Sequence, residues 1–190
     1  MLRLSREEDM PLVRDLILDG ARAGSFDPAL AEPTSEAAYF FSGMRRVVLE
    51  HVWLRPAPGT ETQVAIPAAI WVYEERQVSP RALGFIALRG AGHLGYELWL
   101  IAIHPEYRNR GLGKRMISEI LATPIGQRIM VAQCDLHAIG ARRLARILCE
   151  AGFQSARTGK ASEWLANPAL TPSAMAWLKA TPFQNAFRMN

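Results

Sequence analysis

The chain has 190 residues, of which 49% are hydrophobic and 21% charged, with 22 Lys and Arg against 18 Asp and Glu. These values are those of an ordinary globular protein with one sizeable core, and they exclude a disordered or fibrous chain. The first residues are partly acidic and no run reaches about 18 apolar residues, so we expect a cytoplasmic protein with no membrane partner.

The N-terminal part predicts two helices. Residues 5–8, SREE, fit a capping box in which Ser5 accepts from the Glu8 N–H and the Glu8 side chain reaches back. The helix that begins there should carry one apolar stripe, formed by Leu12, Val13, Leu16 and Ile17. Residues 25–34 indicate a loop, and a second helix is expected over about 35–51, although its valines also permit a strand near Val47.

Three strands are predicted next, over about 63–74, 83–89 and 96–103. The segments between them are rich in turn residues, so we expect neighbouring strands to pair antiparallel. Pro67 has no N–H to donate, and it predicts a bulge or a sheet edge within the first of these strands.

Helices and strands alternate after residue 104. We expect a helix over about 112–121, a strand over about 128–134 and a helix over about 138–151 that Gly152 closes. A weak strand signal over 153–164 and a short helix near 172–180 follow. The order of elements predicts a mixed α/β fold around one sheet.

The segment 104–116, HPEYRNRGLGKRM, directly follows the apolar strand predicted over 96–103. A helix that begins near Gly111 leaves N–H groups without intrahelical partners, and its dipole adds about half a positive charge there. Gly111 and Gly113 lack a Cβ, so a phosphate can approach the backbone, and basic side chains surround them: Arg108, Arg110, Lys114 and Arg115. The segment predicts a diphosphate site, with a glycine turn among solvated arginines as the alternative; it is neither a Walker A loop nor a dinucleotide fingerprint.

Charge is divided unevenly along the chain. Residues 1–107 hold 10 Lys and Arg and 14 Asp and Glu, a net −4, whereas residues 108–190 hold 12 and 4, a net +8. The division favours an anionic ligand on the C-terminal part and a cationic one on the N-terminal part, with uneven solvated surface charge as the alternative. Cys134 and Cys149 lack metal-type spacing, so we expect reduced thiols and no metal site.

Residues 97–121, ELWLIAIHPEYRNRGLGKRMISEIL, resemble motif A of the GNAT superfamily of N-acetyltransferases, in which an apolar strand runs into Arg/Gln-x-x-Gly-x-Gly/Ala and a helix. Residues 2–17 resemble the family's first strand and helix, and 144–153, LARILCEAGF, resemble its motif B. The resemblance implies a GNAT domain over 1–165 with the acyl-CoA N-acyltransferase fold, a central mixed, mostly antiparallel sheet flanked by helices. Residues 166–190 would be a C-terminal extension, with a short helix packed on the domain or at an oligomer interface.

The resemblance also implies acetyl-CoA as the acetyl donor, without a metal. Backbone groups of Ile101, Ala102 and Ile103 would bind its pantetheine arm. The loop and helix start that follow would bind its pyrophosphate, chiefly through backbone N–H groups: Arg108, Asn109, Arg110, Gly111, Leu112, Gly113, Lys114 and Arg115. The expected reaction is direct transfer of the acetyl group to a primary amine in a ternary complex.

An acceptor amine is protonated at pH 7, and neutralising it costs about 4 to 5 kcal/mol, so a general base is expected. Glu97 stands where several family members carry a catalytic glutamate; an acidic residue facing solvent at a strand end is the alternative. Glu74 and Glu75, at the end of an earlier strand, are further candidates.

Motif B departs from the family at two positions. Many members have a tyrosine that protonates the departing CoA thiolate, whereas this chain has Leu148 there, and Ala141 replaces the family's asparagine. A thiol with a pKa near 8.5 is a tolerable leaving group at neutral pH, so water could suffice. Other side chains could supply the proton, although each has a simpler structural explanation: Cys149, Tyr107, His104 and His137.

Other functions remain open on the sequence. The leucine at 148 is compatible with a non-catalytic CoA-binding or regulatory module. A nucleic-acid partner is less favoured, because no aromatic residues interleave with the basic cluster it would use: Arg142, Arg143, Arg146, Arg157 and Lys160. The acceptor is expected to be a small-molecule or peptide amine that no motif specifies, and a homodimer is compatible with the sequence.

Overall fold

The computed structural model describes residues 1–56, 62–75, 81–92, 95–135, 137–158 and 162–168. Its helices are α1 (Met10–Arg22), α2 (Ser35–Glu50), α3 (Leu112–Leu121) and α4 (Ala141–Glu150). Its strands are β1 (Leu2–Leu4), β2 (Val52–Pro56), β3 (Gln63–Glu75), β4 (Arg81–Gly90), β5 (Tyr96–Ile103), β6 (Ile129–Asp135), β7 (Gln154–Thr158) and β8 (Ser162–Ala166). Single 3-10 turns occur at Glu7–Asp9, Pro28–Ala31, Pro105–Tyr107 and Gly126–Arg128.

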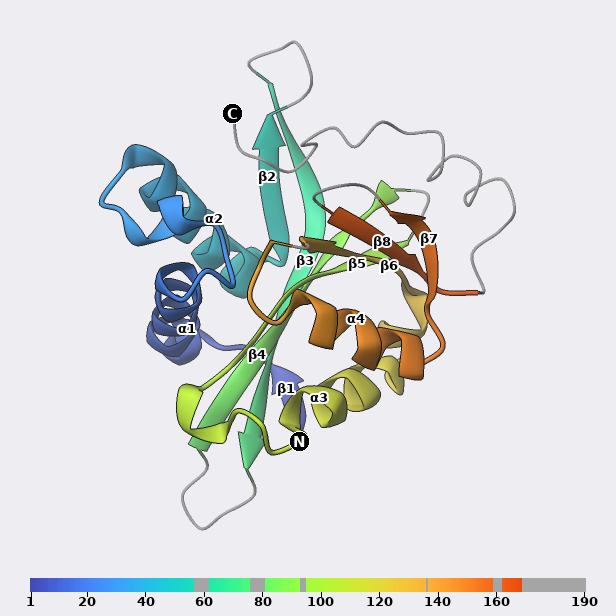
Figure 1. Ribbon diagram of the computed structural model, residues 1–190. Helices are drawn as coiled ribbons and strands as arrows, with labels where there is room; N and C mark the ends of the chain where they lie inside the picture. The colour runs from blue at the N-terminus through green and yellow to red at the C-terminus, as the bar shows by residue number, and fades with distance from the viewer. Residues whose placement is uncertain (57–61, 76–80, 93–94, 136, 159–161, 169–190) are drawn as a thin grey trace.

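The strands form one sheet in the order β1-β3-β4-β5-β6-β8-β7, with β2 paired to β3 as well. Neighbours run antiparallel except β5 and β6, which run parallel. Helices α1 and α2 cover one face and α3 and α4 the other (Figure 1). The predicted mixed, mostly antiparallel sheet flanked by helices is confirmed.

Each face of the sheet buries its own apolar core, because each helix presents one apolar stripe. Helix α1 buries Val13, Leu16 and Ile17 against one face, and α3 buries Met116 and Ile117 against the other; all five are at most 1% exposed. Burying one such side chain stabilises the fold by roughly 1.5 to 3 kcal/mol. The two helix pairs are thereby held on opposite sides of the strand β5.

The predicted capping box at residues 5–8 is wrong. The Ser5 N–H donates to the Ile70 carbonyl at 2.8 Å, which extends the pairing of β1 with β3, and α1 begins only at Met10. Asp9 takes over the capping role, since its Oδ2 accepts from the Arg6 N–H at 2.7 Å. Strand pairing across the sheet overrides the local signal because it satisfies the Ser5 N–H with a distant partner.

Several element boundaries also differ from expectation. Helix α2 continues to Glu50 and ends where His51 adopts a φ of 57°, so the strand considered near Val47 does not form, and β2 begins instead at Val52. Pro67 lies at an edge rather than a bulge: it pairs with Val52, and the β3–β4 register begins one residue later.

The C-terminal part also departs from the predictions. Helix α4 begins at Ala141 rather than near residue 138, because Gly140 before it has a left-handed φ of 90°. The single strand expected over 153–164 is two strands, β7 and β8, that pair antiparallel. The short helix expected near 172–180 lies outside the described residues.

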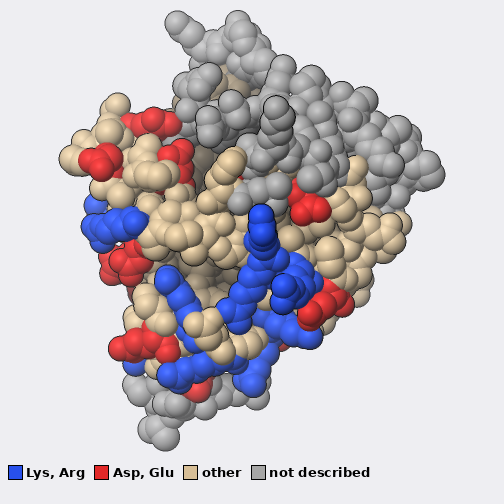
Figure 2. Space-filling view, in the orientation of Figure 1, with Lys and Arg blue, Asp and Glu red and all other residues tan. Residues whose placement is uncertain are grey.

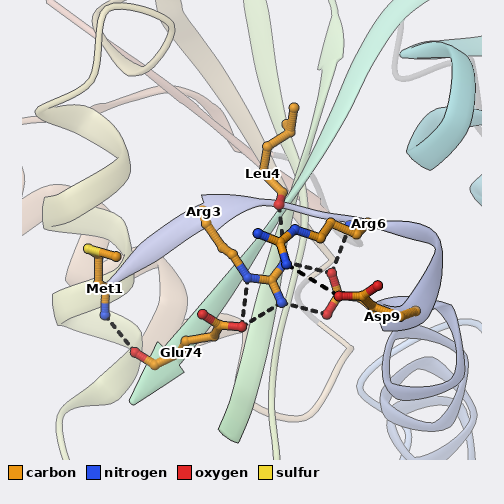
Figure 3. Close-up of polar contacts among 7 residues, drawn as sticks. Met1, Arg3, Leu4, Arg6, Asp9 and Glu74 are labelled. Atoms are coloured by element: carbon orange, nitrogen blue, oxygen red, sulfur yellow. Dashed lines mark hydrogen bonds and ion pairs between the residues drawn. The ribbon is translucent and has the colours of Figure 1, made fainter. Parts of the chain in front are cut away.

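An ion-pair cluster joins β1, β3 and the start of α1. The Arg3 guanidinium lies between Asp9 and Glu74 (Figure 3), and it donates to Asp9 at 2.7 and 2.8 Å and to Glu74 at 2.6 Å. Asp9 is 6% exposed. Burial opposes its charge, but hydrogen bonds from Arg3 and from the Arg6 N–H hold the pKa of Asp9 below its ordinary value.

We expect Asp9→Asn to lower the free energy of unfolding at pH 7 by about 2 to 3 kcal/mol, because it leaves Arg3 with an incomplete partner in a largely buried place. Since the pKa of Asp9 is lowered on folding, its stabilisation is present above the unfolded pKa of about 3.9 and is lost as pH falls below it. Urea unfolding at pH 7 and at pH 3 should therefore show a smaller difference between the two proteins at pH 3. Glu8→Gln is the control, because its pair with Arg6 is exposed and should contribute less than about 1 kcal/mol.

Candidate functional site

Strands β5 and β6 separate along their length. They pair only near their starts, at Tyr96↔Ile129, Glu97↔Val131 and Leu98↔Ala132, although both strands continue for several residues. On its other edge β5 has a bulge at Trp99, because Leu98 faces Leu88 while Leu100 faces Ala87. The β6-facing backbone of residues 99–103 therefore has no strand partner in the part of the chain that is described, and an extended ligand could pair there.

The loop between β5 and α3 presents a run of backbone N–H groups. The N–H groups of Tyr107 and Arg108 close a 3-10 turn, and that of Arg115 donates to the Gly111 carbonyl within α3. Among the described residues, none accepts a hydrogen bond from the N–H groups of residues 109–114. Six consecutive free donors at the start of a ten-residue helix are suited to bind an anion.

The two glycines of the loop are needed for different reasons. Gly111 has a left-handed φ of 75°, and a Cβ added to it would meet no atom within 4 Å. A Cβ on Gly113 would lie 3.3 Å from Ile103 Cδ1 and 3.8 Å from Ile147 Cδ1. Gly111 is thus required by backbone conformation, whereas Gly113 lets α3 pack closely on the end of β5.

The basic side chains around the loop are largely held by protein partners. Arg108 Nε donates to the Ile103 carbonyl at 3.0 Å, and the Arg110 guanidinium stacks on the Tyr107 ring at 5.3 Å. Lys114 Nζ lies 2.8 Å from Glu150 and lowers the pKa of that carboxyl. Figure 2 shows Lys and Arg gathered over the lower centre of this face, where Figure 1 places α3, α4 and the loop. The positive potential is therefore a property of the folded surface, and the free donors are backbone groups.

The residues expected to hold pantetheine lie at the far end of β5, next to the loop. Ile101 and Ile103 are half-buried and pack against the core under α3 and α4, whereas Ala102 is buried on the α1 and α2 side. The Ile103 carbonyl already accepts from Arg108. The structure therefore joins residues 101–103 and 108–115 into one continuous surface.

Glu97 is not part of that surface. It lies near the start of β5, six residues before Ile103, a separation of about 20 Å along an extended strand. Its side chain is 3% exposed and accepts from Arg89 Nε at 2.8 Å and from Arg89 Nη2 at 3.3 Å. The Arg89 guanidinium also stacks on the Trp99 ring at 4.6 Å. A solvent-facing carboxylate, the alternative weighed from the sequence, is therefore wrong.

Arg89 is the functional candidate that the sequence reasoning missed. The signal was present as a charged residue inside the apolar strand LGFIALRG, since a buried arginine needs a paired acid. Its guanidinium joins Glu97 to an aromatic cluster in which Trp99, Trp53 and Phe40 have ring centroids 4.7 to 5.9 Å apart. The three aromatic residues belong to the core on the α1 and α2 side of the sheet, and Trp99 is the bulged residue of β5.

The other candidate acids and bases are placed as follows. Glu74 is ion-paired with Arg3 at 2.6 Å, and Glu75 is half-buried at the end of β3. Leu148 is 1% exposed within the core under α3 and α4, so the position of the family's tyrosine is filled by packed hydrocarbon. Cys149 is exposed, and burial raises the pKa of the Cys134 thiol to about 12.

The remaining candidates lie at the loops that follow β5 and β6. The Tyr107 hydroxyl accepts from Arg81 at 3.0 Å, and His104 stacks against the Tyr107 ring with centroids 5.8 Å apart. His137 is exposed, and its N–H donates to Asp135 Oδ1 at 2.9 Å. These three residues flank the open end of the two strands, and His104 Nδ1 lies 3.9 Å from a Glu106 carboxylate oxygen, beyond hydrogen-bond distance.

A cavity of about 370 Å³ adjoins His104 on the α1 side of the sheet. Its wall is formed mainly by one side of α1: Leu12, Asp15, Leu16, Leu18, Asp19 and Arg22. Two carboxylates four residues apart line it, in the N-terminal half that carries the negative charge, although Asp19 also pairs with Arg22 at 3.6 Å. The uneven charge along the sequence thus corresponds to two different regions of the molecule.

The structure also bears on metal, membrane and nucleic-acid partners. The described residues contain no group of three or more His, Cys, Asp or Glu that could hold a metal ion. None of their helices is long and apolar enough to span a membrane. Of the proposed nucleic-acid cluster, Arg142, Arg143 and Arg146 are exposed on α4, whereas Lys160 and the Arg157 side chain fall outside the described part.

Part of the chain matches a known family. Residues 67–153 match the model of the acetyltransferase (GNAT) domain; they extend from within β3 to just past the end of α4 and contain the whole loop described above. No curated protein matches the chain in sequence.

Solved structures share the fold. An N-acetyltransferase from Staphylococcus aureus Mu50 has a TM-score of 0.57 and 14% identity, covering 87% of this chain and 98% of that one. A diaminobutyrate acetyltransferase from Paenibacillus lautus, solved with its substrate and coenzyme A, has a TM-score of 0.54 and 14% identity over 90% and 96%. A spermidine N-acetyltransferase from Vibrio cholerae, solved with CoA and spermine, has a TM-score of 0.54 and 13% identity over 87% and 91%. Residues 67–153 therefore match the GNAT acetyltransferase domain, and the chain has the fold of solved N-acetyltransferases.

Proposed function

We propose that the protein is an N-acetyltransferase that moves an acetyl group from acetyl-CoA directly to a primary amine in a ternary complex. The six free N–H donors of residues 109–114, placed at the end of the separated strands β5 and β6, carry this proposal. An extended thioester with a diphosphate at one end has the two chemical features that this surface is suited to bind.

The residues of the chain would divide the reaction as follows. The N–H groups of residues 109–114 hold the pyrophosphate, and the unpaired edge of residues 101–103 holds the pantetheine arm. The β6-facing backbone near the Trp99 bulge lies further along the same edge, where its N–H groups would polarise the thioester carbonyl. The thiolate needs little help as a leaving group at neutral pH, which fits the absence of an acid at Leu148.

Glu97 is the proposed general base for the amine. Glu97 pairs with Val131 of β6 and lies two residues before the Trp99 bulge, where the β6-facing backbone becomes free, and its carboxylate oxygens accept hydrogen bonds from Arg89. For Glu97 to accept the amine's proton, the Arg89 pair must open or a water must relay the proton. Arg89 gives this buried carboxylate an oppositely charged partner and two hydrogen bonds.

A small cationic amine is the proposed acceptor class. The structural relatives named above act on spermidine and diaminobutyrate, and the cavity beside His104 carries Asp15 and Asp19.

Two further expectations stay predictions. They are the division into a domain over 1–165 and an extension over 166–190, and the formation of a homodimer.

The test is calorimetry with acetyl-CoA followed by a thiol-release assay over a panel of polyamines, amino acids and peptide amines. The proposal requires micromolar or tighter binding of acetyl-CoA and turnover on at least one amine. Binding without turnover on any amine would support the non-catalytic CoA-binding module, which the buried Leu148 favours.

A further inference from the structure

We propose that Arg143 is a positioning residue for the pyrophosphate loop and acts through Asn109. The inference rests on the proposed function, because the loop is where acetyl-CoA would be held. Arg143 is exposed in the first turn of α4, and its Nη1 donates to Oδ1 of Asn109, 34 residues earlier in the chain. The contact joins the two segments that flank the open end of β5 and β6.

Asn109 has a backbone conformation that needs such support. Its φ is 64°, and His51 is the other non-glycine residue with a positive φ in the described chain. The left-handed conformation costs an L-residue roughly 1 to 2 kcal/mol, and asparagine adopts it most readily when its side chain is hydrogen-bonded. With Arg143 holding its side chain, Asn109 stays in the conformation that leaves its own N–H and those after it without protein acceptors. The arginine thereby aligns backbone donors that it does not itself supply.

Helix α4 is a fixed support for this contact. Its N-terminal loop is tied to the end of α1, because the Ile139 N–H donates to the Gly24 carbonyl at 2.9 Å. Ala141 and Leu148 bury the inner side of the helix in the core. At the other end of α4, Glu150 pairs with Lys114 of α3. Residues 109–114 are therefore held against α4 at both ends, by Arg143 at Asn109 and by Glu150 at Lys114. Of these two contacts, the one from Arg143 holds the residue with the left-handed backbone.

The test measures calorimetric affinity for CoA and for dephospho-CoA, which has the pyrophosphate but not the 3′-phosphate. We expect Arg143→Ala to weaken the binding of both ligands equally, by about 5- to 10-fold, which is the loss expected for one intramolecular hydrogen bond at an exposed site. In Asn109→Gly, the glycine adopts a positive φ without a side-chain partner. Adding Arg143→Ala to that variant should therefore cause no further loss of affinity for either ligand. Arg142→Ala is the matched control, because Arg142 has the same charge and exposure on α4 and no partner among the described contacts; its effect should stay below about twofold.

Each other outcome overturns the positioning role. A loss confined to CoA would show that Arg143 contacts the 3′-phosphate directly. An equal loss in the Asn109→Gly background would show that it acts by charge, and unchanged affinity of the single variant would show that the contact has no role in binding. A wild-type protein that binds neither ligand would instead refute the proposed function, so the two failures are distinguishable. Thermal unfolding of each variant checks that affinities are compared between folded proteins.

Discussion

Gly113→Glu should weaken acetyl-CoA binding by about 100- to 1,000-fold, because it removes several charged contacts at once. The new Cβ would lie 3.3 Å from Ile103 Cδ1, so the Ile103 side chain at the strand end that would hold pantetheine must move by a few tenths of an ångström. The new carboxylate would also stand among the free N–H donors and compete with the phosphate for them. Calorimetry measures the affinity, and a thermal scan verifies the fold.

Two variants separate steric and electrostatic causes. Gly113→Ala introduces only the Cβ, which must displace one flexible side-chain end, so it should cost no more than about 10-fold. Ser118→Glu adds the same charge to an exposed position later in α3 and should change affinity by less than about threefold. If Gly113→Glu bound acetyl-CoA like the wild type, the anion site would lie elsewhere.

Glu97→Gln should lower kcat by about 100- to 10,000-fold while leaving the Kd of acetyl-CoA almost unchanged, because it removes the proton acceptor and leaves the anion loop intact. Because Glu97 is six residues from Ile103 along β5, its substitution should change kcat without changing the Kd of acetyl-CoA. The readouts are steady-state thiol release and calorimetry. Loss of the buried pair with Arg89 should lower thermal stability in either case, whereas a merely structural role for Glu97 would also weaken acetyl-CoA binding as kcat falls.

The pH profile distinguishes a base from a structural carboxylate. If Glu97 accepts the proton, the acidic limb of kcat/KM should disappear in the glutamine variant, whereas a structural carboxylate would leave its shape unchanged. Glu74→Gln is the comparison, since Glu74 is also an ion-paired carboxylate but lies on β3. If the acidic limb of kcat/KM disappeared in Glu74→Gln and not in Glu97→Gln, Glu74 on β3 would be the general base and the role of Glu97 would be refuted.

The run of free backbone N–H groups at residues 109–114 could be predicted from the sequence because it depends on local structure. A strand, two glycines and a helix start follow one another within residues 96–121, so the free N–H groups arise from neighbours along the chain. Long helices and strands could be predicted for the same reason, since their apolar periodicity is visible within a short stretch of sequence. The boundaries that failed, at Ser5, His51 and Gly140, lie where a distant strand or a left-handed residue decides the backbone.

The sequence by itself determined the family resemblance, the order of most elements and the prediction of a diphosphate site. Only the tertiary structure decided which polar side chains have ion-pair or hydrogen-bond partners. It pairs Glu97 with Arg89, Glu74 with Arg3 and Asn109 with Arg143, all contacts between residues on different elements. Ionisable groups interact through space, so their partners depend on strand register and helix placement, which no short stretch of sequence contains.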